Sequence, residues 1–161
     1  LRLIDGTKDA PDSGEIVMPE GWRCALLSPD PYVITWTSVE RNVAMAAGAG
    51  RTPEERLELA KKLVKLVRLE DYADMTPVEL STGMRQRLGL ARVLASQAQV
   101  LLMDESTSNL DAATAQEIEK TVFGLPNVMV LFVTHHAQPS TYSMSDCILQ
   151  IRDGRLLEKE N

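Results

Sequence analysis

Two adjacent carboxylates, Asp104 and Glu105, directly follow an uninterrupted apolar run at residues 100–103. A run this short, without alternation of polar and apolar residues, predicts a strand that is covered on both faces of a parallel sheet. Ligands bind at the carboxyl ends of such strands, so the two acids are placed to serve a metal ion and a water molecule. In phosphoryl-transfer enzymes the first acid can hold Mg²⁺ and the second can orient or deprotonate the attacking water. The alternative is that Asp104 caps a turn and Glu105 is a solvated surface residue.

A Ser-Thr-Gly turn precedes these acids by about twenty residues. Ser81 predicts the N-cap of a helix that starts near Gly83, and a glycine there lets backbone N–H groups approach an anion at the positive end of the helix. Such a turn, taken alone, is usually just a helix cap. Followed by two acids at this spacing, it indicates a cradle for a phosphate group.

The whole stretch LSTGMRQRLGLARVLASQAQVLLMDESTSNLD, residues 80–111, resembles the signature helix, Walker B strand and D-loop of an ATP-binding cassette (ABC) ATPase. The usual signature of that family is LSGGQ followed by QR. Here Thr82 stands where the family usually has glycine, and Met84 stands where it usually has glutamine. The β-branched Thr82 narrows the backbone conformations available at that position.

The resemblance implies a role for each acid and for the turn. Ser81 and Gly83 would contact the γ-phosphate of an ATP molecule held by a partner subunit. Asp104 would ligate Mg²⁺ through water, and Glu105 would be the catalytic base. Asp111, in the SNLD turn, would be the D-loop aspartate at the interface between two cassettes.

A histidine ends the next apolar strand, which we expect at residues 128–133. His135 would then lie on the same sheet edge as Asp104 and Glu105, within range of the same phosphate; the alternative is a packed or surface imidazole. The sequence FVTHH resembles the H-loop of the family. The resemblance implies that His135 contacts the γ-phosphate and holds the geometry of the water, whereas His136 is only a neighbour.

The N-terminal part of the chain resembles the stretch that follows the phosphate-binding P-loop in this family. Residues 1–4 are expected to be the tail of a helix and residues 7–13 a loop. The resemblance implies that the P-loop and its lysine precede Leu1, so we expect the chain to be a fragment that is inactive by itself. SPDPYVITWTSVERNV, residues 28–43, resembles the Q-loop region, where the family usually shows a glutamine and then T-V-x-E-N. No glutamine is present there, and we assign no Q-loop ligand.

Two helices are expected between this region and the signature. Ser38 predicts the cap of a helix at residues 39–47, and Thr52 with Glu55 forms a capping box for a helix at residues 53–69. We expect the buried face of the second helix to contain three leucines, Leu59, Leu63 and Leu66. An apolar and aromatic loop connects the strand expected at residues 23–27 to the helix expected at residues 39–47, and it contains Tyr32, Val33, Ile34 and Trp36. This loop is either packed in the core or a docking surface for a partner.

Other segments complete the pattern. Short strands are expected at residues 15–18, 23–27, 147–151 and 155–157, with a helix at residues 112–123. Cys24 and Cys147 lie in apolar strand-like runs and are expected to be two buried thiols rather than a disulfide or a metal pair.

Composition limits the class of protein. The 161 residues, of which 44% are hydrophobic, suit one domain with a core. A net charge of −6 argues against a nonspecific nucleic-acid binder. No apolar run approaches the length of a membrane span, and no signal segment opens the chain.

The sequence therefore predicts an α/β fold: a mostly parallel sheet of the P-loop NTPase kind, flanked by helices, with an inserted helical subdomain. We expect residues 1–161 to be a partial ABC ATPase domain. Its parts would be the post-P-loop strands and Q-loop region at 1–37, the helical subdomain and signature at 38–97, and the Walker B, D-loop, H-loop and C-terminal strands at 98–161.

The resemblance implies an ATP-hydrolysing subunit of an ABC transporter that uses ATP and Mg²⁺. Its partners would be a transmembrane domain and a second cassette, identical or different, and it would work at the cytoplasmic face of a membrane. Two alternatives stay open: a degenerate or regulatory cassette that binds nucleotide or a partner without efficient turnover, and a fragment that serves only as an interaction piece.

Overall fold

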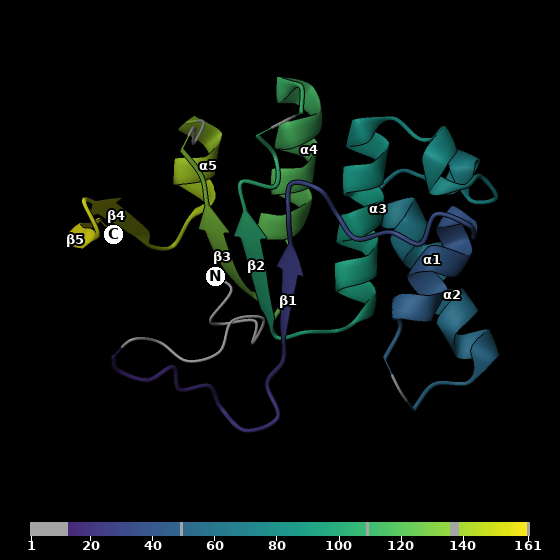
Figure 1. Ribbon diagram of the computed structural model, residues 1–161, viewed down its shortest axis with the longest axis horizontal. Coiled ribbons are helices and arrows are strands. Elements are labelled where there is room, and N and C mark those ends of the chain that lie inside the picture. The colour runs from purple at the N-terminus through teal and green to yellow at the C-terminus, as the bar shows by residue number, and fades with distance from the viewer. Residues whose placement is uncertain (1–12, 49, 109, 136–138, 161) are drawn as a thin grey trace.

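The computed structural model describes residues 13–48, 50–108, 110–135 and 139–160 (Figure 1). Three parallel strands form the central sheet in the order β1 (Cys24–Leu27), β2 (Val100–Asp104) and β3 (Met129–Val133). The first four residues of β2 are all buried, which confirms the prediction of a strand covered on both faces. Their apolar side chains are the reason that β2 occupies the middle of this sheet.

Helices lie beside the sheet in two groups (Figure 1). α1 (Val39–Ala46) and α2 (Pro53–Leu66) pack against each other and against α3 (Thr82–Ala95), and α3 in turn packs against β1. α4 (Ala112–Phe123) connects β2 to β3 and contacts α5 (Pro139–Met144). The chain between α2 and α3 contains two short 3₁₀ turns, η1 (Glu70–Tyr72) and η2 (Pro77–Glu79). α3 is therefore the element that joins the helical group to the sheet.

A separate antiparallel hairpin, β4 (Ile148–Arg152) and β5 (Arg155–Glu160), follows α5 and lies at the far end of the molecule in Figure 1. Its turn uses left-handed backbone at Asp153 and Gly154, with φ of 49° and 72°. These strands confirm the two expected near the C-terminus. No helix of the described residues is long and apolar enough to cross a membrane.

The capping signals locate the helix ends well. Thr52 accepts a hydrogen bond from the N–H of Glu55, whose carboxylate accepts one from the N–H of Thr52, so the predicted capping box is confirmed. α2 nevertheless ends at Leu66 rather than at residue 69. The cause is Arg68, whose φ of 56° is incompatible with a continuing right-handed helix.

Several predictions from the sequence are wrong. Residues 15–18 form no strand: they have no ladder partner among the described residues, and Val17 is 78% exposed. Cys147 is exposed rather than buried, because it precedes the exposed hairpin, and Cys24 is only partly buried. Leu66 is exposed, whereas Leu59 and Leu63 pack against the core as expected, beside the fully buried Ala60 and Val64. α5 was not predicted, and residues 1–4 lie outside the described residues.

Candidate functional site

The carboxyl edge of the sheet brings Glu105 and His135 together. The parallel register pairs Asp104 with Val133, and the N–H of Glu105 donates to the carbonyl of Val133 at 2.9 Å. Both strands end at this pair of residues. Beyond their ends, Nε2 of His135 lies 2.5 Å from Oε1 of Glu105. The side chains remain accessible, with 71% of His135 and 37% of Glu105 exposed. A substrate at this edge can therefore reach both groups.

Glu105 has a strained backbone. Its φ of 47° lies in the left-handed region, which costs a non-glycine residue on the order of 1–3 kcal/mol. The turn after it is closed by two hydrogen bonds, because the N–H and the hydroxyl of Ser108 both donate to the carbonyl of Glu105, at 3.0 and 2.8 Å. Strain that the surrounding bonds enforce is typical of a residue whose side chain must point in one functional direction.

Asp104, the last residue of β2, is half-buried beside Glu105. Among the described residues no group of three or more His, Cys, Asp or Glu side chains is placed to hold a metal ion. A single carboxylate fits Mg²⁺, because this ion usually keeps several waters and takes further ligands from the phosphates of a substrate. The chemistry of Asp104 therefore fits a Mg²⁺ ligand.

Ser81, Gly83 and Asp111 lie together in a second place, where two helix N-termini meet. Ser81 is the N-cap of α3 and accepts from the N–H of Met84 at 3.3 Å. Asp111 is the N-cap of α4 and accepts from the N–H of Thr114 at 3.0 Å. The two ends enclose a pocket of about 300 Å³, lined by Ser81, Thr82, Gly83, Met84, Arg87, Leu110, Asp111 and Thr114.

Close packing explains the glycine in this pocket. A β-carbon at Gly83 would lie 3.2 Å from Cγ2 of Thr114, so a larger residue would require the Thr114 side chain to shift. Arg87 of α3 also binds Glu117 of α4 at 3.0 Å, and Glu117 binds Arg68, the second residue after α2, at 2.6 Å. The α3 N-terminus is therefore attached to α4 by both contact and charge.

The pocket combines the partial positive charge of two helix N-termini with one carboxylate, Asp111. Helix N-termini carry partial positive charge and unpaired N–H groups. The hydrogen bond from the N–H of Thr114 lowers the pKa of Asp111 below its ordinary value, so this carboxylate is ionised and serves as a cap. Thr82 occupies the first position of α3, where its hydroxyl accepts from Arg85 at 3.3 Å. A threonine is thus accommodated as a helical residue at this position.

Two buried amides, Asn42 and Gln86, were missed from the sequence. Nδ2 of Asn42 donates to the carbonyls of Ile34, Thr37 and Ser38 at 2.9, 3.2 and 3.1 Å, and its Oδ1 accepts from the N–H of Ile34 at 2.8 Å. Gln86 donates to the carbonyl of Ser28 at 3.0 Å. The signal was available, since Asn42 ends an S-V-E-R-N stretch that resembles T-V-x-E-N, and Gln86 begins the Gln-Arg pair after the signature.

The side chains of the loop that these amides hold differ in their exposure. Val33 packs against the core and Ile34 is half-buried. Tyr32 and Trp36 are 84% and 82% exposed, so core packing does not account for them. Exposed aromatic side chains on a rigidly held loop favour the alternative of a docking surface.

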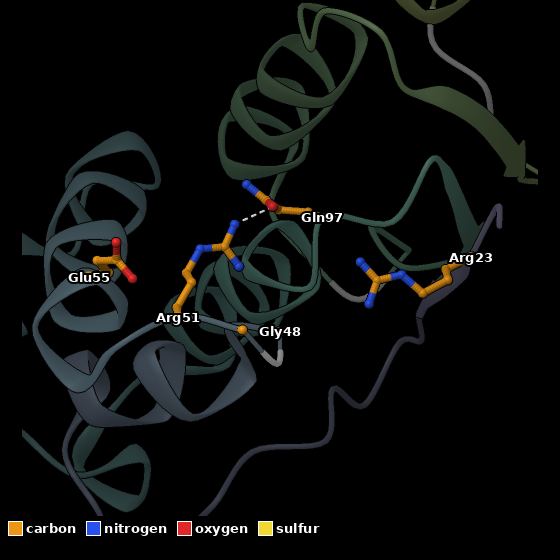
Figure 2. A pocket seen from close by; sticks show the side chains of 6 residues that line it. Arg23, Gly48, Arg51, Glu55 and Gln97 are labelled. Carbon is orange, nitrogen blue, oxygen red and sulfur yellow. Dashed lines mark hydrogen bonds between the residues drawn. The ribbon is translucent and has the colours of Figure 1, made fainter.

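A larger depression of about 440 Å³ lies at the opposite end of the sheet, beside the residues that precede β1 and β2. Figure 2 shows Arg51 pointing to Gln97, with Arg23 on the other side of Gly48. Arg51 donates to Oε1 of Gln97, and Arg23 donates to the carbonyl of Ser96 at 3.0 Å. Both cations thus lie at the carboxyl end of α3, where positive charge complements the helix dipole. This depression is accounted for by helix capping.

Comparisons with known proteins identify a matching family and similar sequences. Residues 7–108 match the sequence profile of a family described as ABC transporter. The chain is 33% identical to the ABC transporter ATP-binding protein MJ0412 of Methanocaldococcus jannaschii, over 98% of this chain and 63% of that protein. It is 34% identical to the taurine import ATP-binding protein TauB of Rhizobium johnstonii, over 99% of this chain and 62% of that protein.

A solved structure is also similar. It is the dimeric, post-hydrolysis state of the ATP-binding cassette MJ0796 bound to ADP and Pi, with a TM-score of 0.73 and 25% sequence identity. The match covers 86% of this chain and 62% of that one. The chain therefore spans a little under two thirds of the length of these relatives.

Proposed function

The chain belongs to the ABC transporter family, and from this we propose that the full-length protein binds and hydrolyses ATP to drive transport across a membrane. The observation that carries the proposal is the contact between Glu105 and His135 at the carboxyl edge of the sheet, beside Asp104. A carboxylate, an imidazole and a second carboxylate in this arrangement suit the attack of water on a terminal phosphate.

In the proposed reaction Glu105 is the base that orients the attacking water and accepts its proton. His135 contacts Glu105 through Nε2, and its N–H can turn from that carboxylate to the γ-phosphate when a nucleotide is bound. Asp104 would hold Mg²⁺, which when bound neutralises charge on the phosphate oxygens. The strained backbone of Glu105 supports this assignment, because the bonds to Val133 and Ser108 keep its carboxylate at the open edge.

Ser81, Gly83 and Asp111 act, in this proposal, on a nucleotide bound by a second cassette. None of the three lies in the Glu105–His135 contact, and their pocket between two helix N-termini suits a phosphate presented from outside the chain. The dimeric state of the similar MJ0796 cassette supports such an assembly. Residues 38–97 would then form the helical subdomain that carries the signature to its partner.

The proposed direction of transport is import, at the cytoplasmic face of the membrane, because TauB and other relatives are import ATP-binding proteins. The exposed Tyr32 and Trp36 would contact the transmembrane component. Asn42 would keep their loop in one conformation during this contact, since its amide donates to the carbonyls of Ile34, Thr37 and Ser38.

The test is Glu105→Gln in the full-length protein. This change keeps the shape and leaves Asp104 intact, so ATP should still bind, while phosphate release should slow by roughly two or more orders of magnitude. The control is Glu58→Gln, the same change at an exposed position of α2, which should leave turnover unchanged. The variant should also accumulate an ATP-bound dimer in size exclusion. Unchanged turnover of Glu105→Gln beside an active wild type would remove Glu105 from the mechanism.

A second candidate is a cassette that binds nucleotide without efficient turnover. Thr82 in a glycine position and the absence of a glutamine at residues 28–30 favour it. ATP binding by calorimetry, together with wild-type phosphate release no faster than that of Glu105→Gln, would support this candidate over the hydrolase.

A further inference from the structure

A buried carboxylate with no part in the proposed chemistry lies on α4. The buried face of this helix contains three apolar residues, Ala115, Ile118 and Val122. Glu119 lies on the same face, with only 4% of its surface exposed. Glutamate is rarely buried to this extent unless its oxygens have partners. Its presence among apolar residues therefore needs a specific reason.

Two buried threonines supply the partners. The hydroxyl of Thr107 lies 3.3 Å from Oε1 of Glu119, and the hydroxyl of Thr141 donates to Oε2 at 2.7 Å. Thr107 is 8% exposed and Thr141 is 3% exposed. Within the part of the chain that the structure describes, no basic side chain lies within ion-pair distance of Glu119. Among the described residues, hydroxyl groups are thus the partners that hold the carboxylate.

The two threonines come from the two segments that carry the reactive groups. Thr107 lies in the turn that follows β2, two residues after Glu105, and Thr141 lies in α5, six residues after His135. Glu119 therefore binds both segments, one with each oxygen. α5 has only six residues, and α4 is the element that it contacts most.

We propose that Glu119 is a positioning residue that fixes the distance between Glu105 and His135. The strained backbone of Glu105 persists only where its surroundings over-determine it, and the bond to Thr107 anchors the turn in which it lies. The bond to Thr141 anchors the helix that follows His135. A fully satisfied buried network of this kind favours one geometry over its alternatives. The expected effect on kcat rests on the proposed hydrolysis. The expected effect on the structural order of the two segments does not.

The substitutions separate positioning from stability. Thr141→Val keeps the volume and removes the donor, whereas Thr141→Ser keeps the hydroxyl. Glu119→Leu removes both acceptors, whereas Glu119→Gln keeps the shape and one acceptor. The control is Val122→Ala, which cuts a fully buried side chain of the same helix face and lowers stability without touching either threonine.

Steady-state kinetics of the full-length protein should show a change in kcat without a matching change in KM. Thr141→Val and Glu119→Leu should lower kcat by about tenfold or more with KM within about twofold, because small displacements of catalytic groups affect the chemical step. Thr141→Ser and Glu119→Gln should recover most of the loss, and Val122→Ala should keep kcat at a temperature where it is folded. A kcat for Thr141→Val within about twofold of wild type, or an equal loss in Val122→Ala, would overturn the proposal.

Amide hydrogen exchange of the nucleotide-free protein gives a readout that does not depend on turnover. Glu119→Leu should raise exchange selectively in residues 105–108 and in α5, while exchange in α3 stays unchanged. If the wild type proves inactive, the proposed hydrolysis fails and exchange alone decides the role of Glu119. Unchanged exchange in both segments refutes the role whether or not the protein hydrolyses ATP.

Discussion

Replacing Gly89 by alanine should destabilise the protein, although the same change in a helix interior normally stabilises by about 1 kcal/mol. Gly89 lies on the buried face of α3, the helix that joins the helical group to the sheet. A β-carbon there would lie 2.3 Å from Cβ of Pro31 and 3.2 Å from Cδ1 of Leu27. The glycine thus allows α3 to approach the loop that follows β1.

The magnitude follows from these distances. Carbon atoms pack at about 3.5–4.0 Å, so Pro31 must move by more than about 1 Å. Its ring cannot rotate away, and the loop is held on both sides, at Ser28 by Gln86 and at Ile34 by Asn42. Overpacking of a close-packed core costs up to about 3 kcal/mol, which leaves a net loss of about 2 kcal/mol after the gain in helix propensity.

Urea unfolding followed by circular dichroism measures this loss, and a double-mutant cycle assigns its cause. Pro31→Gly removes the atoms that the new methyl group would meet, so Gly89→Ala in the Pro31→Gly background should be neutral or stabilising. The coupling energy between the two positions should be about 2–3 kcal/mol. A Gly89→Ala protein at least as stable as the wild type, or the absence of coupling, would refute the packing argument.

Two further predictions concern polar groups. The N–H of Thr114 lowers the pKa of Asp111, so the ionised carboxylate should stabilise the fold above about pH 4 and lose this effect as pH falls through the lowered pKa. Urea unfolding at a series of pH values should show a gap between wild type and Asp111→Asn that shrinks in acid; a constant gap contradicts this. Asn42→Leu should cost about 3 kcal/mol or more, because it leaves the part-buried carbonyls of Ile34 and Thr37 without this donor and removes an acceptor from Arg92, whose pKa burial already lowers. Exposed Arg41→Ala, measured in the same unfolding assay, should change stability by less than about 0.5 kcal/mol, and similar losses in both variants would argue against the network.

Local features of this protein could be read from its sequence. The apolar run at residues 100–103 identified a strand covered on both faces, and Thr52, Ser81 and Asp111 are the helix caps that their residue types favour. These features depend on hydrogen bonds and periodicity within a few residues, so no knowledge of distant contacts is needed. The order of acids at the end of β2 is equally local.

Contacts between distant segments were decided only by the tertiary structure. The 2.5 Å approach of His135 to Glu105 depends on the register of β2 with β3, and the burial of Glu119 depends on threonines 12 and 22 residues away. Residues 15–18 have the composition of a strand but no partner strand, and Cys147 is apolar but has nothing to cover it. Strand pairing and burial are properties of two surfaces, so one segment of sequence specifies only half of each.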